Sequence, residues 1–150
     1  MTFIRTDEEV ALNNLLVASR ETVDHYQHAM EFFKELQVAN ILSAIVQKRE
    51  ALLVRIENAI RALGDLPSMP DPDKETGQML FQQLTAAISA DTAAEILKQR
   101  VEAEKHLVEL VDACRATSLA ESQTQLLDDM DDHITESEDQ LCIQIKSSST

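Results

Sequence analysis

Apolar and small residues recur along most of this chain at alternating steps of four and three residues. Over residues 7–34 they fall at Leu12, Leu16, Ser19, Val23, Tyr26, Met30 and Phe33. This spacing puts one apolar stripe along one side of an α-helix, as in helices that pack together in bundles. Only two glycines occur in 150 residues, which leaves little material for the tight turns of a sheet. The sequence therefore predicts an all-α fold.

We expect five helices, at about residues 7–34, 37–63, 74–89, 91–115 and 119–145. Thr6 or Asp7 can cap the first helix and Asp91 the fourth, and Gly64 can end the second. After Gly64 three prolines interrupt the stretch GDLPSMPDPDKE, so this is the one linker. Amphipathic helices of this length pack as an antiparallel bundle, and 150 residues suffice for a single domain.

The charge of the chain excludes some classes of partner. It has 27 acidic and 13 basic residues, a net charge of -14, which repels the phosphate backbone of nucleic acids.

The N-terminus MTFIRTDEEV carries acids where a signal peptide carries basic residues, and no apolar run approaches the ~18 residues of a membrane span. Cys114 and Cys142 lie in apolar helical stretches and are expected to be buried and free, as in a reducing compartment. We expect a soluble cytoplasmic protein that binds neither nucleic acid nor membrane.

The segment 128–139, DDMDDHITESED, makes the predicted last helix strongly acidic. Five of its acids lie opposite the apolar stripe of that helix: Asp128, Asp129, Asp132, Glu136 and Asp139. A solvated face is the first interpretation, and a docking surface for a basic protein or for loosely bound divalent ions is the alternative. His133 lies at the border of the stripe, where a histidine that packs in the core is expected. The continuous stripes and the short third helix also predict a homodimer.

Residues 21–35, ETVDHYQHAMEFFKE, raise the question of a metal site. Helical rotation of ~100° per residue puts Glu21, Asp24 and His28 on the side opposite the stripe, and His25 also outside it. We therefore interpret this stretch as the solvent-facing side of the first helix. A surface zinc held by Asp24, His25 and His28 is the alternative, because spacings of three and four bring donors together on a helix.

Three segments resemble a bacterial family of unknown function with the ferritin-like four-helix fold, distantly similar to rubrerythrins. They are LNNLLVASRETVDHYQHAMEFF, QKREALLVRIENAIRALGDLP and AEILKQRVEAEKHLVELV. The similarity covers about residues 7–115 and rests on Tyr26, on Arg49 and on the Leu-Gly-x-x-Pro that ends the second helix. It implies two helical hairpins joined by a long crossover. The helix at 119–145 would then be an addition to this ferritin-like core.

Ferritin-like enzymes hold two metal ions with a Glu from each of two helices and a Glu-x-x-His from each of the other two. No Glu or Asp stands three residues before a histidine in this chain. The polar side chains predicted to point inward are instead Tyr26, Arg49, Arg100 and Glu104. We therefore expect neither a metal nor another cofactor in the core.

One acid between two guanidiniums, with a phenol nearby, has two interpretations. It can fix the register of the helices, since buried charges have to be paired. It can also form a pocket in which the surplus positive charge receives a carboxylate or phosphate of a small ligand. The function expected first is non-catalytic binding or assembly. The alternatives are a di-iron or di-manganese oxidase or storage protein with atypical ligands, and a small-anion sensor.

Overall fold

The computed structural model describes residues 6–68, 90–118 and 121–148, and in these the chain is all-helical, as predicted. Four helices are present there: α1 (Asp7–Phe32), α2 (Leu36–Ala62), α4 (Ala90–Arg115) and α5 (Glu121–Ser148). The helix predicted at 74–89 lies outside the described residues.

The ends of α1 and α2 follow from single residues. The Oγ1 of Thr6 accepts a hydrogen bond from the backbone N–H of Glu9 at 3.2 Å, which confirms the predicted cap of α1. Gly64 has φ 88, a left-handed conformation that favours glycine, just after α2 ends. The predicted cap at Asp91 is wrong, because Asp91 lies within α4, whose described part begins at Ala90.

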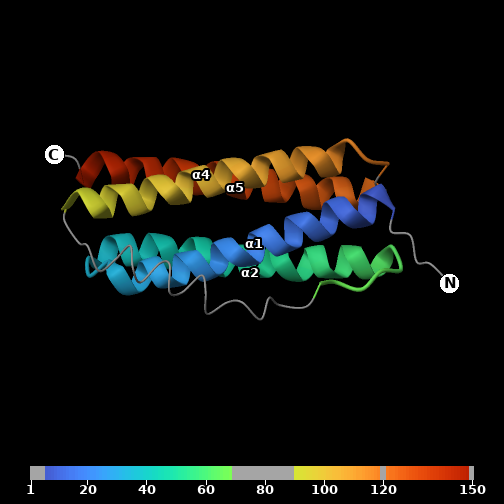
Figure 1. Ribbon diagram of the computed structural model, residues 1–150, viewed down its shortest axis with the longest axis horizontal. Coiled ribbons are helices and arrows are strands. Elements are labelled where there is room, and N and C mark those ends of the chain that lie inside the picture. The colour runs from blue at the N-terminus through green and yellow to red at the C-terminus, as the bar shows by residue number, and fades with distance from the viewer. Residues whose placement is uncertain (1–5, 69–89, 119–120, 149–150) are drawn as a thin grey trace.

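The four helices lie side by side in two layers, α1 with α2 and α4 with α5 (Figure 1). Across the layers α1 packs on α4 and α2 packs on α5, and each helix runs antiparallel to both of its neighbours (Figure 1). The backbone N–H of Ser118 donates to Glu8 at 3.1 Å, which ties the end of α4 to the start of α1. In the described part of the chain α5 is thus one wall of the bundle.

The two hairpins are connected between opposite ends of the bundle. The end of α2 lies where α1 begins, whereas α4 begins at the other end (Figure 1). The first residues after α2 already turn back along α1: Asn13 Oδ1 accepts from the backbone N–H of Ser68 at 3.1 Å, and Arg20 donates to the Ser68 carbonyl. The buried side-chain amide of Asn13 therefore holds this turn against α1 by a hydrogen bond.

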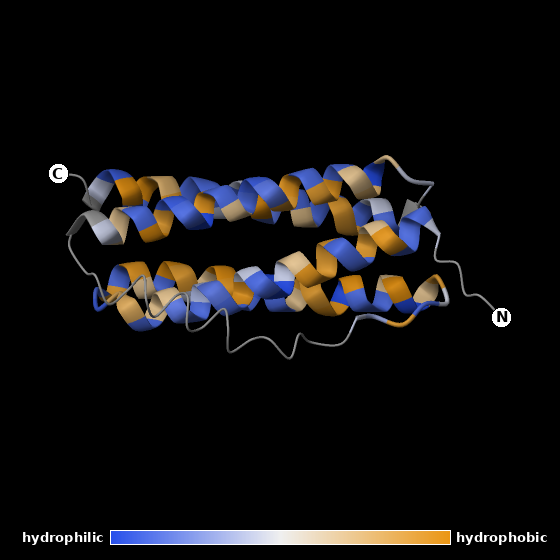
Figure 2. Ribbon diagram, in the orientation of Figure 1, coloured by the Kyte–Doolittle hydropathy of each residue, from blue (hydrophilic) through white to orange (hydrophobic). Residues whose placement is uncertain are grey.

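Apolar side chains from all four helices fill the space between the layers. Hydrophobic and hydrophilic positions alternate along every helix (Figure 2), as amphipathic packing requires. The described helices include no stretch long and apolar enough to cross a membrane. Cys114 is buried, and burial raises the pKa of its thiol to about 12, whereas Cys142 is exposed. The expectation that both cysteines are buried is therefore wrong for Cys142.

Part of the acidic surface of α5 is paired with basic side chains of the chain itself. Asp129 contacts Arg55 of α2 at 2.8 Å, and Asp128 contacts Arg115 of α4, also at 2.8 Å. Glu136 pairs in the same way with Lys48 of α2. Each such exposed pair stabilises the fold by only about 0 to 1 kcal/mol. Together they flank α5 on both sides, so fewer of its acids are left for a basic partner.

Candidate functional site

The centre of the bundle holds an arginine that is completely buried. Arg49 lies midway along α2, on the stripe that Ile45, Leu52 and Ile56 make hydrophobic, and its exposed fraction is 0%. Because Arg49 shares this stripe, the packing that buries those side chains also carries the guanidinium into the core. A charge at that depth has to be compensated inside the protein.

Glu104 of α4 supplies the compensating charge. Arg49 Nη1 donates to Glu104 Oε1 at 2.6 Å, and Nη2 donates to Oε2 at 2.8 Å. Both side chains have 0% exposed surface, so this is a bidentate salt bridge with no access to water. The two residues come from α2 and α4, which lie diagonally across the bundle.

Residues from the other two helices complete the cluster. From α1, Thr22 Oγ1 accepts from Arg49 Nη1 at 3.0 Å, and the hydroxyl of Tyr26 donates to Glu104 Oε1. The Arg49 guanidinium carbon lies 5.6 Å from the centre of the Tyr26 ring, within range of a cation–π interaction. From α5, His133 Nε2 accepts from Arg49 Nε at 3.1 Å. We call Thr22, Tyr26, Arg49, Glu104 and His133 the interior cluster; it joins all four described helices at one level.

Burial keeps the uncharged members of the interior cluster uncharged. It raises the pKa of Tyr26 well above its usual value, and the negative Glu104 raises it further, so the phenol stays protonated and donates. Burial also lowers the pKa of His133 to about 3, helped by the positive charges of Arg49 and Lys48. His133 is therefore neutral at pH 7, in keeping with its role as an acceptor toward Arg49.

Arg100 is the predicted site residue that takes no part in the hydrogen bonds of the interior cluster. It is buried on α4, one turn before Glu104, with 7% of its surface exposed. Its Nε and Nη1 have no hydrogen-bond partner, and burial lowers its pKa. Both carboxylate oxygens of Glu104 bind Arg49, while the charge of Glu104 also acts on Arg100 and opposes the effect of burial on its pKa. Two buried arginines thus face one fully buried glutamate, Glu104, and the half-buried Glu138 lies near it.

The histidines near the end of α1 are less exposed than predicted. Glu21 is exposed, but Asp24, His25 and His28 are all half-buried, so the interpretation as a solvent-facing side holds only in part. Burial and the charge of Arg100 lower the pKa of His25 to about 4. His28 Nδ1 lies 2.6 Å from the backbone carbonyl of Asp24, a contact within the helix. Residues 6–68, 90–118 and 121–148 contain no cluster of three or more His, Cys, Asp or Glu side chains able to hold a metal ion.

Sequence reasoning identified Tyr26, Arg49 and Glu104 but missed the roles of Thr22 and His133. His133 stands three residues after Met130 and four before Ser137, so it continues the buried stripe of α5. That spacing predicts that His133 points into the bundle, but it does not predict the hydrogen bond with Arg49. A second carboxylate was missed as well: Glu138 of α5 is half-buried, and burial together with nearby Glu104 raises its pKa.

Comparisons with protein-family models, with curated proteins and with solved structures gave no match for this chain. The function has to be argued from the geometry of the interior cluster and its surroundings.

Removing Arg49 should strongly destabilise the fold. Arg49→Ala leaves Glu104 buried without its counter-ion, so we expect the free energy of unfolding to fall by about 3 to 5 kcal/mol. Urea unfolding followed by circular dichroism measures this change. Arg55→Ala, which removes the exposed pair with Asp129 on the same helix, is the control and should cost less than about 1 kcal/mol. Equal losses for the two variants would show that the interior salt bridge is not special.

Acid should destabilise the protein through its buried histidines. The pKa of His133 is about 3 and that of His25 about 4 in the folded state, against about 6.5 in an unfolded chain. Between pH 6.5 and 4 the unfolded state binds more protons, so stability falls as the pH falls through this window. The slope from His133 is at most about 1.4 kcal/mol per pH unit.

Unfolding free energies at pH 7 and pH 5 test this expectation. The difference between the two values should be smaller in His133→Gln than in the wild type, whatever the absolute stability of the variant. His106→Gln is the control, since His106 is exposed on α4 and its loss should leave the difference unchanged. An unchanged difference in His133→Gln would refute the assignment of a neutral buried histidine.

Proposed function

We propose that this protein is a ferritin-like helical bundle that acts by binding or assembly and not by catalysis. The ferritin-like assignment is supported by the two antiparallel hairpins and by a connection that joins opposite ends of the bundle, as a long crossover requires. The resemblance of residues 7–115 to such a family points the same way.

The observation that carries the proposal is the buried salt bridge between Arg49 and Glu104. In ferritin-like enzymes the metal ions lie between the four helices, which is where the interior cluster lies here. A pair of divalent ions needs about four carboxylates to offset its charge. This interior offers the fully buried Glu104 and the half-buried Glu138 against two buried arginines. A cation therefore already occupies the place of the metals, and further cations are repelled.

Metal ions should accordingly leave the protein unaffected. We expect Fe(II) or Mn(II), added under anaerobic conditions, to produce no measurable rise in melting temperature, because a ligand that does not bind the native state cannot stabilise it. Mg(II) at the same concentration controls for general screening of the net charge of -14. Elemental analysis and an ultraviolet-visible spectrum of protein purified without chelator complete the test. Two ions bound per chain at micromolar affinity, and lost in Glu104→Ala, would replace this proposal by the dimetal oxidase.

Arg100 favours a second candidate, the binding of a small anion. A buried guanidinium with two unpartnered nitrogens is costly by itself and suited to an oxoanion. The anion would be a small carboxylate or phosphate, with Arg100 as its main contact.

The variant Arg100→Met tests this candidate. If Arg100 serves an anion, its replacement by an apolar side chain of similar length should stabilise the anion-free protein, by up to about 1 to 4 kcal/mol. The variant should also lose the saturable stabilisation that phosphate or acetate gives to the wild type. Arg61→Met, at an exposed position of α2, is the control. A variant that is less stable than the wild type, with an unchanged response to the anions, would assign Arg100 a purely structural role.

The proposed partners of the protein stay predictions. The large exposed apolar side chains on α1 are Val10 and Val17, and those on α2 and α5 are Leu36, Val54 and Ile143. Single exposed apolar residues are ordinary on soluble proteins, so they do not identify the face of a homodimer. A basic protein on α5 would have to compete with Lys48, Arg55 and Arg115 for acids that they already contact.

A further inference from the structure

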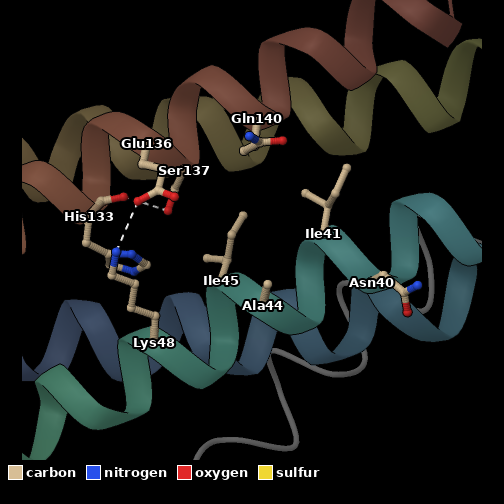
Figure 3. A pocket seen from close by; sticks show the side chains of 9 residues that line it. All are labelled: Asn40, Ile41, Ala44, Ile45, Lys48, His133, Glu136, Ser137 and Gln140. Atoms are coloured by element: carbon tan, nitrogen blue, oxygen red, sulfur yellow. Dashed lines mark hydrogen bonds and ion pairs between the residues drawn. The ribbon is translucent and has the colours of Figure 1, made fainter.

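A cavity of about 330 Å³ opens between α2 and α5 (Figure 3). Its volume lies at the lower end of the range for small-molecule sites. Ile41, Ala44 and Ile45 of α2 form an apolar wall, and His133 of α5 also lines it. Lys48 and Glu136 pair across the cavity from the two helices at 3.0 Å (Figure 3). The cavity thus combines apolar surface with a few polar groups on one side.

His133 connects this cavity to the interior cluster. Its Nε2 accepts a hydrogen bond from Arg49, and an arginine can only donate, so the proton of the neutral ring is on Nδ1. None of the described groups accepts a hydrogen bond from Nδ1. The ring of His133 lies beside the Lys48 side chain (Figure 3). An N–H donor and an ammonium group are therefore available together at the same side of the cavity.

The charges around the cavity favour an anion. The ammonium of Lys48 pairs with Glu136 and also interacts with Asp129, and the side chains of Lys48 and Glu136 are more than half exposed, at 57% and 62%. Exposed pairs of this kind are weak, so another carboxylate can replace Glu136. Behind His133 lies the buried guanidinium of Arg49, which donates to the ring. A neutral ligand would gain only the contact with the apolar wall, and the ammonium of Lys48 would repel a cationic one.

We propose that the cavity between α2 and α5 binds a small monocarboxylate with an apolar body. The carboxylate accepts from His133 Nδ1–H and from Lys48, and the apolar body packs on Ile41, Ala44 and Ile45. This site rests on the proposed binding function and gives it a ligand class. It differs from the Arg100 candidate, which lies on α4 and takes a small oxoanion without an apolar part.

Titration with benzoate, followed by amide chemical shifts of the 15N-labelled full chain, tests the site. We expect saturable shifts in residues 41–48 and 133–140. Benzamide has the same ring and no charge, and we expect it to bind at least about tenfold more weakly. Equal affinities would overturn the assignment of a carboxylate. Shifts centred on α4 around Arg100, with none in α2 and α5, would move the anion to Arg100 and overturn the cavity site.

Two matched pairs of variants on α2 locate the ligand. Ala44→Leu fills the cavity and should weaken benzoate at least about tenfold, while Ala51→Leu, two helical turns further on at another exposed position, should not. Lys48→Gln should weaken benzoate about tenfold and leave benzamide unchanged. Arg55→Gln, which removes the other ion pair between α2 and α5, should change neither affinity. All four substitutions are at exposed positions, so the fold should tolerate them. Benzoate binding that is unaffected by Ala44→Leu and Lys48→Gln would refute the proposal.

The metal titration keeps this test separate from that of the proposed function. If benzoate does not bind and metals do not bind either, the cavity site is wrong and binding elsewhere remains the function. If two metal ions bind in the core, the proposed function fails, and the benzoate titration alone decides on the cavity site.

Discussion

A single buried ion pair constrains the rest of this bundle. Once Arg49 is carried into the core with α2, its charge has to meet a carboxylate inside the protein, and Glu104 of α4 provides it. The geometry permits little adjustment, because a bidentate pair fixes both the distance and the orientation of the two side chains. Thr22, Tyr26 and His133 then use most of the remaining donors and acceptors of the pair. Sliding any of the four described helices by one turn would leave a buried polar group without its partner.

The same cluster explains why binding is a better account of the function than metal chemistry. A dimetal centre stores positive charge among carboxylates, whereas here the positive charge belongs to the chain and the carboxylates are few. The proposed binding of a small anion rests on Arg100, whose Nε and Nη1 have no hydrogen-bond partner. His133, which accepts a hydrogen bond from Arg49, also lines the cavity between α2 and α5. His133 thus links the interior cluster to the cavity in which we propose that a carboxylate binds.

The sequence located the site residues better than it located their partners. Arg49 and Glu104 each lie on an apolar stripe of period 3.6, so helical rotation alone predicts that both point inward. Rotation within one helix says nothing of the angle and distance to the next, so it does not predict that Arg49 of α2 binds both carboxylate oxygens of Glu104. The pattern of α5 predicts only that His133 packs in the core, because its role as an acceptor depends on α2 lying beside α5. The half-buried state of His25 likewise depends on α4, which covers part of α1.

By itself, the sequence determined the helices, the all-α class, the cap at Thr6, the glycine that ends α2 and the residues that turn inward. These are local properties, set by the period of the apolar residues and by hydrogen bonds between residues close in the chain. Only the tertiary structure decided that α5 forms a wall of the bundle and that its acids pair with α2 and α4. It also decided that a cavity, lined by Lys48 and Glu136 among others, lies between α2 and α5. The physical reason is that such features depend on contacts between residues up to about ninety positions apart, such as Lys48 with Glu136. The pattern within a single helix does not specify which neighbour it will meet.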